Sequence, residues 1–446
     1  MKKICLALPT NRACADAIVA IHEEAGYAAG NFDVEVHLLI LDSSDELVYA
    51  SHADTAAGLR QTSNVVVHHL DEAAQRVFLE RAIRNSGIDH ADPERLLALM
   101  LPDGVSYGAC TNRVFLIAAA LGCESVHRRD SDSGYQSRQG RPVFPVQHEL
   151  SSVGRPAGEV VDVVTESTRD PVHADKTVVL AGASFVGELS VDISEIEQLD
   201  SEVYRDVVGL WAPMSWTDEQ KRELVDESFR GAGTAPFVHD HSELCIVDPM
   251  RIDMCNIAFH RDTYERVPLL PALDTIGSDY FLMHAIYDAG LPGVLHNRHI
   301  VNFYTPERRT DSGFEAYQLR FAKFFLSMLY LNFIYERMGE AGANLLDGGG
   351  RLRSDAIAAL ARESVFLDQS ENRWRLDVIG RSYGKLGGRY AAFAEVLEAR
   401  GAELLSRAQA DIEDFALLTE AWQALVRGSR ASARAVLPQQ AGRRSS

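Results

Sequence analysis

The stretch from Cys110 to Tyr135, CTNRVFLIAAALGCESVHRRDSDSGY, decides the predicted fold of this chain. Its small and apolar residues from Val114 to Leu121 predict a helix that ends at Gly122, a residue type common just past helix ends. A short strand is expected next, and Asp130-Ser131-Asp132 follows it. Two carboxylates at this spacing can share one hard divalent cation, which keeps coordination positions open for substrate phosphates. The stretch therefore indicates chemistry on a substrate that carries a diphosphate.

Strands and helices alternate through the N-terminal part. Strands are predicted at Lys3–Leu8, Val34–Leu41 and Asn64–His69, and helices at Cys14–Ala29 and Glu72–Asn85. This alternation is typical of a parallel α/β sheet, whose ligands bind beyond the carboxyl ends of the strands. Polar tips at 10–12, 42–45 and 130–132 follow predicted strands. We expect these tips to meet in one crevice.

Beyond Gly134 the pattern is weaker. Strands are predicted at Glu159–Val164, Thr177–Phe185, Cys245–Val247, Met254–Phe259, Gly293–His296 and His299–Phe303, and a short helix at Asp279–Ala289. From Gly313 onward only helices are expected, and one Phe-rich stretch (321–333) should pack in the core or in a homodimer. The predicted organisation is an α/β domain over 1–304, a helical C-terminal domain over 305–438, and a disordered Gly/Ser/Arg-rich tail over 439–446.

Composition limits the partners. The chain has 446 residues and a formal net charge of −20, which argues against nucleic acid and against anionic membrane surfaces. No run of about 18 apolar residues is found, so we expect no transmembrane helix and no integral membrane association. The six cysteines form no Cys-x-x-Cys pair, which favours a reducing, cytoplasmic location.

Four segments, in this order, resemble the metal-dependent GT-A glycosyltransferases, especially the broad family-2-like group. The segments are Leu8–Arg12, Gly108–Gly122, Arg129–Asp132 and Met254–Gly290. They are similar, respectively, to the Pro-Thr-x-x-Arg turn that receives the nucleotide (here the arginine comes one residue early), the helix before the metal motif, the Asp-x-Asp motif, and the acceptor-side segment. The resemblance runs from about Lys3 to Pro306, and it implies a GT-A fold with a Rossmann-like, mostly parallel central sheet.

The resemblance implies glycosyl transfer from a nucleoside-diphosphate sugar to a small soluble acceptor. Mn²⁺ or Mg²⁺ would be held by Asp130 and Asp132. His299 is expected to be the third ligand in preference to His296, because it comes closer to the family's ligand position after a strand, and histidine suits Mn²⁺ better than Mg²⁺. The expected donor-binding residues are Pro9, Thr10, Arg12, Asp42, Asn112, Arg113, Arg129 and Asp130.

On the acceptor side, Asp279 matches the family's catalytic acid, which removes a proton from the acceptor hydroxyl. The family often has Glu-Asp at this point, whereas this chain has Ser278-Asp279, so Asp274 is a nearby substitute. Small residues near Gly182 would permit close approach of a sugar. The expected acceptor-binding residues are Ser184, Glu188 and Trp216.

Other interpretations stay open. An Asp-x-Asp triplet is commonly a solvated turn, Asp279 could be a helix N-cap, and Arg129 could lie on the surface. His239-Asp240-His241, together with Asp248 or Asp253, would be the metal cluster of a hydrolase. A sugar-1-phosphate nucleotidyltransferase would share the sheet and the acids, but it needs a glycine-rich loop after the first strand, and Pro9–Ala17 has no glycine. A non-catalytic scaffold is a further alternative.

Overall fold

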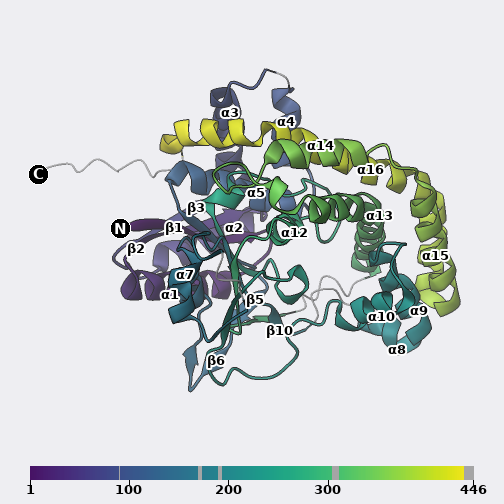
Figure 1. The fold of residues 1–446 in the computed structure, drawn as a ribbon, viewed down its shortest axis with the longest axis horizontal. Coiled ribbons are helices and arrows are strands. Elements are labelled where there is room, and N and C mark those ends of the chain that lie inside the picture. The colour runs from purple at the N-terminus through teal and green to yellow at the C-terminus, as the bar shows by residue number, and fades with distance from the viewer. Residues whose placement is uncertain (90, 169–172, 189–192, 304–310, 436–446) are drawn as a thin grey trace, which may run out of the picture.

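The computed structural model describes residues 1–89, 91–168, 173–188, 193–303 and 311–435. Its centre is a nine-stranded sheet with the order β3-β2-β1-β4-β12-β9-β13-β11-β8 (Figure 1). The strands are, in that order, Val65–Leu70, Val34–Asp42, Lys2–Thr10, Ser125–Arg129, Asn256–His260, Leu180–Gly182, Gly293–His296, Ser242–Cys245 and Glu166–Ser167. A three-stranded sheet joins β10 (Phe185–Gly187), β14 (Ile300–Asn302) and β5 (Ser133–Tyr135), and β6 (Ser137–Arg138) pairs with β7 (Arg141–Pro142).

The N-terminal half of the large sheet is parallel: β1 pairs in parallel with β2 and β4, and β2 with β3. Strand β12 runs antiparallel to both of its neighbours, β4 and β9. The side chains on both faces of β1 and β2 are mostly apolar and buried, as is typical of parallel strands covered by helices. The register places Thr10 opposite Asp42 at the carboxyl edge. The expected α/β class with a mostly parallel central sheet is confirmed.

The helices up to α12 are α1 (Ala15–Asn31), α2 (Glu46–Gly58), α3 (Glu72–Ser86), α4 (Pro93–Met100), α5 (Tyr107–Leu121), α6 (Val146–Ser152), α7 (Ala157–Val160), α8 (Ser194–Leu199), α9 (Ser201–Val208), α10 (Asp218–Glu227), α11 (Arg261–Tyr264) and α12 (Phe281–Asp288). Helices α1, α3 and α5 pack against this sheet, whereas α9 packs against the C-terminal helix α15 (Ser370–Leu386), away from the sheet (Figure 1). Helix α5 is buried along almost its whole length, starts at the capping side chain of Ser106, and stops at Gly122, whose φ of 76° is left-handed. Helix α5 is therefore followed by strand β4, as the sequence predicts.

The C-terminal part is helical. It consists of α13 (Asp311–Ala341), α14 (Ser354–Ser364), α15 (Ser370–Leu386) and α16 (Gly388–Ala431). In α13, Phe321 and Phe325 are buried within the chain itself. None of the helices in the described ranges is long and apolar enough to cross a membrane. The expected tail over 439–446 lies outside the described residues.

Helix α16, the yellow-green helix across the top of Figure 1, returns over α3 and α5. Trp422 is fully buried, belongs to the same core as Phe115 of α5, and donates from Nε1 to the carbonyl of Tyr264 at 2.9 Å. A Cβ at Gly428 would lie 2.1 Å from the carbonyl oxygen of Ala82, so only glycine permits this helix crossing. The helical region therefore shares one hydrophobic core with the sheet.

Three predicted strands differ from the structure. Residues 157–163 form α7 and a 3₁₀ turn that begin after Pro156. Val160 is buried, whereas Val161 and Val163 are both exposed, so these side chains do not follow the alternation of a half-buried strand. The strand predicted over 177–185 is split, since the chain leaves the large sheet after Gly182 and joins the small one at Phe185. Strand β11 ends at Cys245, where the sequence predicted it to begin.

Candidate active site

Two adjoining cavities lie at the carboxyl edge of the parallel strands. The first, the strand-end cavity, encloses about 130 Å³ and is lined by the turn after β1 (9–12), Leu41, Ser43, the start of α5 and its approach (104–107), Arg113 and the segment after β4. The second, the aromatic cavity, encloses about 170 Å³ between that segment and helix α13. Both are lined by Tyr107, Arg128, Asp130 and Asp132. The predicted Asp-x-Asp motif therefore stands where the two cavities meet.

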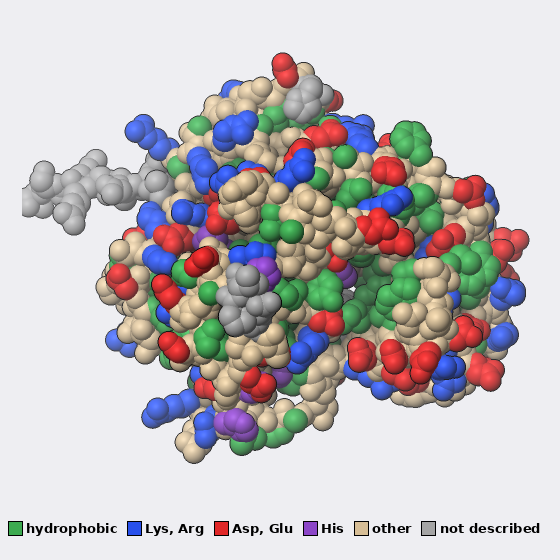
Figure 2. Space-filling view, in the orientation of Figure 1, with side chains coloured by type: hydrophobic (Ala, Val, Ile, Leu, Met, Phe, Trp, Pro, Cys, Tyr) green, Lys and Arg blue, Asp and Glu red, His purple; other side chains and the backbone are tan. Residues whose placement is uncertain are grey.

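The aromatic cavity has an apolar body and a charged end. Its apolar wall includes Phe185, Trp211, Phe229, Met250, Met254, Phe324, Met328 and Leu331. Its charged end holds Arg128 together with Asp130, Asp132, Asp253 and Asp279. Figure 2 shows hydrophobic side chains around a hollow in the face between the sheet and the helices to its right. Such a cavity, largely apolar with a few convergent polar groups, is typical of a small-molecule site.

Arg128 organises the charged end. Its Nη2 lies 3.0 Å from Oδ1 of Asp130, and its Nη1 donates to Oδ2 of Asp279 at 2.9 Å and to the carbonyl of Met254 at 3.0 Å. Burial alone would lower the pKa of Arg128, but Asp130 and Asp279 outweigh it and raise that pKa. Arg128 is therefore a permanent cation between two of the predicted site acids.

The two acids of the motif differ in their surroundings. Burial raises the pKa of Asp130 to about 6; Arg128 opposes this shift, and the charges of Asp132, Asp253 and Asp279 add to it. Asp132 accepts a 2.9 Å hydrogen bond from Nη1 of Arg12, in the turn after β1. Negative charge thus accumulates around Asp130, and the arginines offset only part of it.

Asp279 does not cap helix α12, whose N-cap is Tyr280 without a side-chain cap bond. It is 5% exposed, lines the aromatic cavity and is bound by Arg128. Burial raises its pKa, and Arg128 partly reverses that rise. The capping interpretation is therefore wrong, and the carboxylate faces the charged end of the cavity.

Asp253 is a site acid that the resemblance did not identify. It accepts from the hydroxyl of Tyr280 at 2.6 Å and from the backbone N–H of Cys255 at 3.0 Å. It lies just before β12, and because β12 is antiparallel to β4, the start of β12 is at the carboxyl edge of β4. Polar residues that follow strands were expected at this edge of the sheet, and Asp253 comes before a strand instead. An acid directly before an apolar strand is the feature of the sequence that marks this position.

Arg129 and Asn112 have structural roles. Nε and Nη2 of Arg129 bind both oxygens of Glu24 at 3.0 and 2.8 Å, and Nη2 also donates to Glu149 at 2.9 Å, so this buried group points away from both cavities. Successive strand residues point to opposite faces, so Arg128 and not Arg129 faces the site. Asn112 exchanges hydrogen bonds with the backbone N–H and carbonyl of Leu269. It ties α5 to the segment before α12.

The other predicted donor residues fall into two groups. Pro9, Thr10, Arg12 and Arg113 line the strand-end cavity. Nη1 of Arg113 donates to the carbonyl of Met100 at 2.6 Å, and burial lowers the pKa of Arg113. Asp42 is 1% exposed and lines neither cavity, whereas its neighbours Leu41 and Ser43 line the strand-end cavity.

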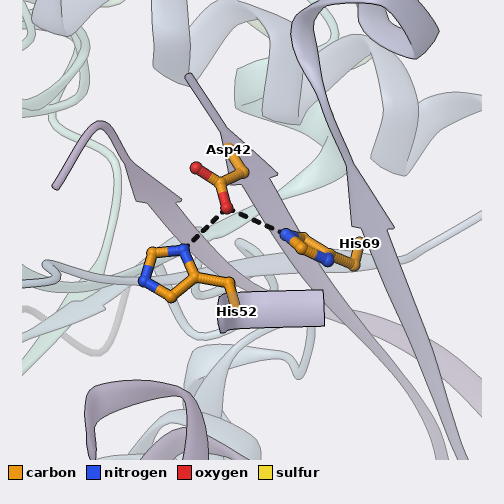
Figure 3. Close-up of side chains that lie close together, drawn as sticks. All are labelled: Asp42, His52 and His69. Carbon is orange, nitrogen blue, oxygen red and sulfur yellow. Dashed lines mark hydrogen bonds and ion pairs between the residues drawn. The ribbon is translucent and has the colours of Figure 1, made fainter. Parts of the chain in front are cut away.

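The carboxylate of Asp42 belongs to a buried cluster with His52 and His69 (Figure 3). Its Oδ2 lies 2.7 Å from Nδ1 of His52 and 2.9 Å from Nε2 of His69, while Oδ1 accepts the N–H of Ser44 at 3.0 Å. Burial would raise the pKa of Asp42, but the bonds from His69, Ser44 and His52 lower it far below its usual value.

This cluster is the one group of three metal-ligand side chains found close together among the described residues. However, Nε2 of His52 accepts the backbone N–H of Cys14 at 3.0 Å. The ring proton is therefore on Nδ1, where it is donated to Asp42, and Nδ1 has no lone pair for a metal. The donor set fits a hydrogen-bonded network that fastens α2 and β3 to the end of β2, and it does not fit a metal centre.

Several predicted residues lie outside both cavities: His299, Glu188, Trp216 and Asp274. Nδ1 of His299 accepts the N–H of Ser184 at 3.2 Å, which occupies that ring nitrogen. Ser184 itself lines the aromatic cavity, as predicted for an acceptor residue. Trp211 lines it too, whereas Trp216, five residues further along, is 39% exposed.

The junction of the cavities has the chemistry of a hard-cation site. Asp130 and Asp132 offer carboxylate oxygens, the ligands that Mg²⁺ and Mn²⁺ prefer. Burial is the main cause of the raised pKa of Asp130, and the charges of Asp132, Asp253 and Asp279 add to it. The candidate metal ligands at this junction are carboxylate oxygens. The predicted histidine ligand, His299, is not among the residues that line either cavity.

The fold and the crevice define an α/β protein with a two-chambered small-molecule site at the carboxyl edge of its sheet. The chain belongs to a family of unknown function, DUF6271, whose model matches residues 2–438. A comparison with curated proteins finds no match.

Two solved structures show some similarity over most of the chain. A mannosyltransferase from Pyrobaculum calidifontis, in complex with GDP-Man and Mn²⁺, shares 13% identity at a TM-score of 0.33, with 94% of this chain and 86% of that chain covered. Residues 1–349 of TarS from S. aureus share 10% identity at a TM-score of 0.32, with 93% and 90% covered. Scores this low leave the function to be argued from the site itself.

Proposed function

We propose that this protein is a glycosyltransferase that moves a sugar from a nucleoside-diphosphate donor to an acceptor hydroxyl. The observation that carries this proposal is the position of Asp130 and Asp132 at the junction of two cavities. A group-transfer enzyme must hold two substrates so that their reacting atoms meet. One cavity then serves the donor, the other serves the acceptor, and the acids stand between them.

The strand-end cavity is the proposed donor side. It combines the turn after β1, the exit of β2 and the side chain of Arg113, at the edge where α/β sheets bind their ligands. Arg12 and Arg113 supply positive charge for a diphosphate. Asp130 and Asp132 would hold Mg²⁺ or Mn²⁺, which, when bound, neutralises the charge that develops on the leaving nucleotide.

Asp279 is the proposed base. It lies at the charged end of the aromatic cavity, and burial raises its pKa toward the range in which a carboxylate accepts protons effectively. Arg128 orients it through a hydrogen bond to Oδ2 and partly reverses the rise in its pKa. In an inverting transfer the acceptor oxygen would bond to the anomeric carbon, the bond from that carbon to the diphosphate would break, and Asp279 would take the hydroxyl proton.

Incubation with UDP-, GDP- and dTDP-sugars in the presence of Mn²⁺, read out as release of the nucleoside diphosphate, tests the proposal. We expect release with at least one donor, and loss of that release in Asp132→Asn. An absence of release across the panel, together with no binding of any of the three nucleotides by calorimetry, would contradict a transferase function.

A further inference from the structure

We propose that the acceptor is a compound with one aromatic ring and a hydroxyl group, neutral or positively charged, bound in the aromatic cavity. This inference rests on the proposed glycosyl transfer and names the substrate class of the second cavity. It makes the expected small soluble acceptor more specific, and it differs from the sugar that the small residues near Gly182 would admit.

The wall of the cavity is built from aromatic rings. The rings of Trp211 and Phe229 are stacked with their centroids 5.2 Å apart, and Phe324 meets Trp211 edge-on at 5.3 Å. Met328 and Leu331 of α13 continue this apolar wall. A sugar would place hydroxyl groups against this apolar wall, which is costly where they lose water and gain no partner, whereas an aromatic ring gains from the same wall.

The backbone at Phe229 has an unusual conformation that places its ring in this wall. Its φ is 63°, in the left-handed region that bulky residues avoid. Gly231, two residues on, also has a left-handed φ, and a Cβ there would lie 2.7 Å from the ring of Phe185. Strained backbone of this kind concentrates at ligand sites, so the position of the Phe229 ring points to a binding role.

The volume sets the size of the ligand. The cavity encloses about 170 Å³, and an apolar protein cavity of roughly 150 Å³ is enough to bind benzene. One ring with a short substituent therefore fits inside, and a larger molecule would have to extend through the opening.

The charges set the preferred ligand charge. Asp253, Asp279 and Glu227 line the cavity together with the two acids of the motif. Arg128, the cation in this lining, is already bound to Asp130 and Asp279. An anionic ring would meet uncompensated carboxylates, so neutral and cationic rings are favoured.

The ring hydroxyl would reach the charged end while the ring occupies the apolar body. Its oxygen forms the new bond to the anomeric carbon of the donor, and the bond from that carbon to the diphosphate breaks. The electron pair of the broken bond leaves with the nucleoside diphosphate, and the hydroxyl proton passes to Asp279. The step needs no reactant besides donor and acceptor.

Three phenols of matched size test the proposal: tyramine (cationic), 4-hydroxybenzyl alcohol (neutral) and 4-hydroxyphenylacetate (anionic), with glucose as the sugar control. Each is titrated calorimetrically into the full chain with Mn²⁺ and UDP, and again with Mn²⁺ and GDP. We expect tyramine and 4-hydroxybenzyl alcohol to bind about tenfold more tightly than the anion, and glucose to show no binding.

Phe229→Gly removes one ring of the wall at a backbone conformation that glycine adopts readily, since φ is 63° there. We expect this variant to bind tyramine about tenfold more weakly with nucleotide affinity unchanged. Trp216→Ala, at the exposed tryptophan outside the cavity, is the matched control and should bind tyramine normally.

The outcomes separate this inference from the proposed function. If nucleotide binds with Mn²⁺ and is released from a sugar donor, but no phenol binds or increases that release, the acceptor class is wrong and the transferase function stands. If tyramine binds and is weakened by Phe229→Gly while no nucleotide binds, the ring site is supported and the transferase function fails. Equal binding of glucose and tyramine, or unchanged tyramine affinity in Phe229→Gly, overturns the inference.

Discussion

Nη1 of Arg128 donates to Oδ2 of Asp279 at 2.9 Å across a sequence separation of 151 residues. The same guanidinium lies 3.0 Å from Asp130. One buried cation thus ties the acid proposed for the metal to the acid proposed for proton transfer. Asp130 directly follows β4, and Asp279 lies in the segment just before α12.

Nucleotide affinity should depend on a divalent cation. Without one, the carboxylates at the charged end of the aromatic cavity would repel a diphosphate. Calorimetry with UDP and with GDP, first with Mn²⁺ and then with EDTA, measures the difference. Equal affinities in the two conditions would remove the metal from the mechanism.

Asp279→Asn should lower turnover by about 10²–10⁴-fold, because it removes the proposed general base, while donor affinity changes little. Asn still accepts a hydrogen bond from Arg128, so the contact persists without the charge. Asp274→Asn is the control: Asp274 lines neither cavity and lies 3.9 Å from Arg320. Normal turnover in Asp279→Asn, with loss in Asp274→Asn, would transfer the role to the substitute acid.

Asp42→Asn should destabilise the fold by about 1–3 kcal/mol, because Asn has one accepting oxygen where the two oxygens of Asp42 accept from His52, His69 and Ser44. The lowered pKa of Asp42 means that its contribution is present above the pKa of an unfolded Asp and is lost as pH falls through the folded value. Urea denaturation measures the change, and added Zn²⁺ should not alter it if the cluster holds no metal.

The matched control for that variant is Asp45→Asn, three residues away. The side chain of Asp45 caps helix α2 by accepting from the N–H groups of Leu47 and Val48. Asn caps helices about as well as Asp, so its stability should match that of the native protein. A similar loss of stability in both variants would show that this segment does not tolerate Asp-to-Asn substitution in general. The hydrogen bonds of Asp42 would then not be the cause of the loss.

Asp132→Asn should affect turnover far more than stability. Its carboxylate is partly exposed and bound by Arg12, so we expect a stability change within about 1 kcal/mol and a loss of turnover of about 10²-fold or more. Activity per folded molecule and the urea midpoint, measured on the same sample, separate the two effects. A large drop in the midpoint with activity intact would make Asp132 structural.

Asp288→Asn should stabilise the protein at pH 8 and not at pH 4. Burial raises the pKa of Asp288 to about 7, and Oδ2 has no hydrogen-bond partner among the described residues. Between about pH 4 and 7 the folded state binds more protons than the unfolded state, so the free energy of unfolding falls as pH rises. Urea titrations at both pH values test this, and parallel pH profiles for the two proteins would contradict it.

The sequence predicted what is local. The apolar runs of β1 and β2 and the helix closed by Gly122 were recognisable because burial on both faces and a left-handed glycine leave clear patterns. All five residues of β4 are buried, so the sequence does not reveal which of its arginines faces the site. The family resemblance points to Arg129 as the donor-binding residue, whereas Arg128 faces the site.

Other features depend on segments far apart in the chain. Phe229 and Phe324 come together with Trp211 only through tertiary packing. Asp253 reaches the crevice because β12 is antiparallel, an orientation that composition and periodicity do not encode. The fold class was therefore predictable, whereas only part of the candidate site was.

The return of α16 over α3 has a consequence for biosynthesis. Asn85 at the end of α3 donates to Ser432, just after α16, across 347 residues, and Trp422 lies in the same core as Phe115. Helices α3 and α5 therefore leave the ribosome before α16, the helix that packs over them, has been made. Because such long-range contacts form slowly, we expect the nascent chain to depend on chaperones until synthesis is complete, and a fragment that ends before α16 to aggregate.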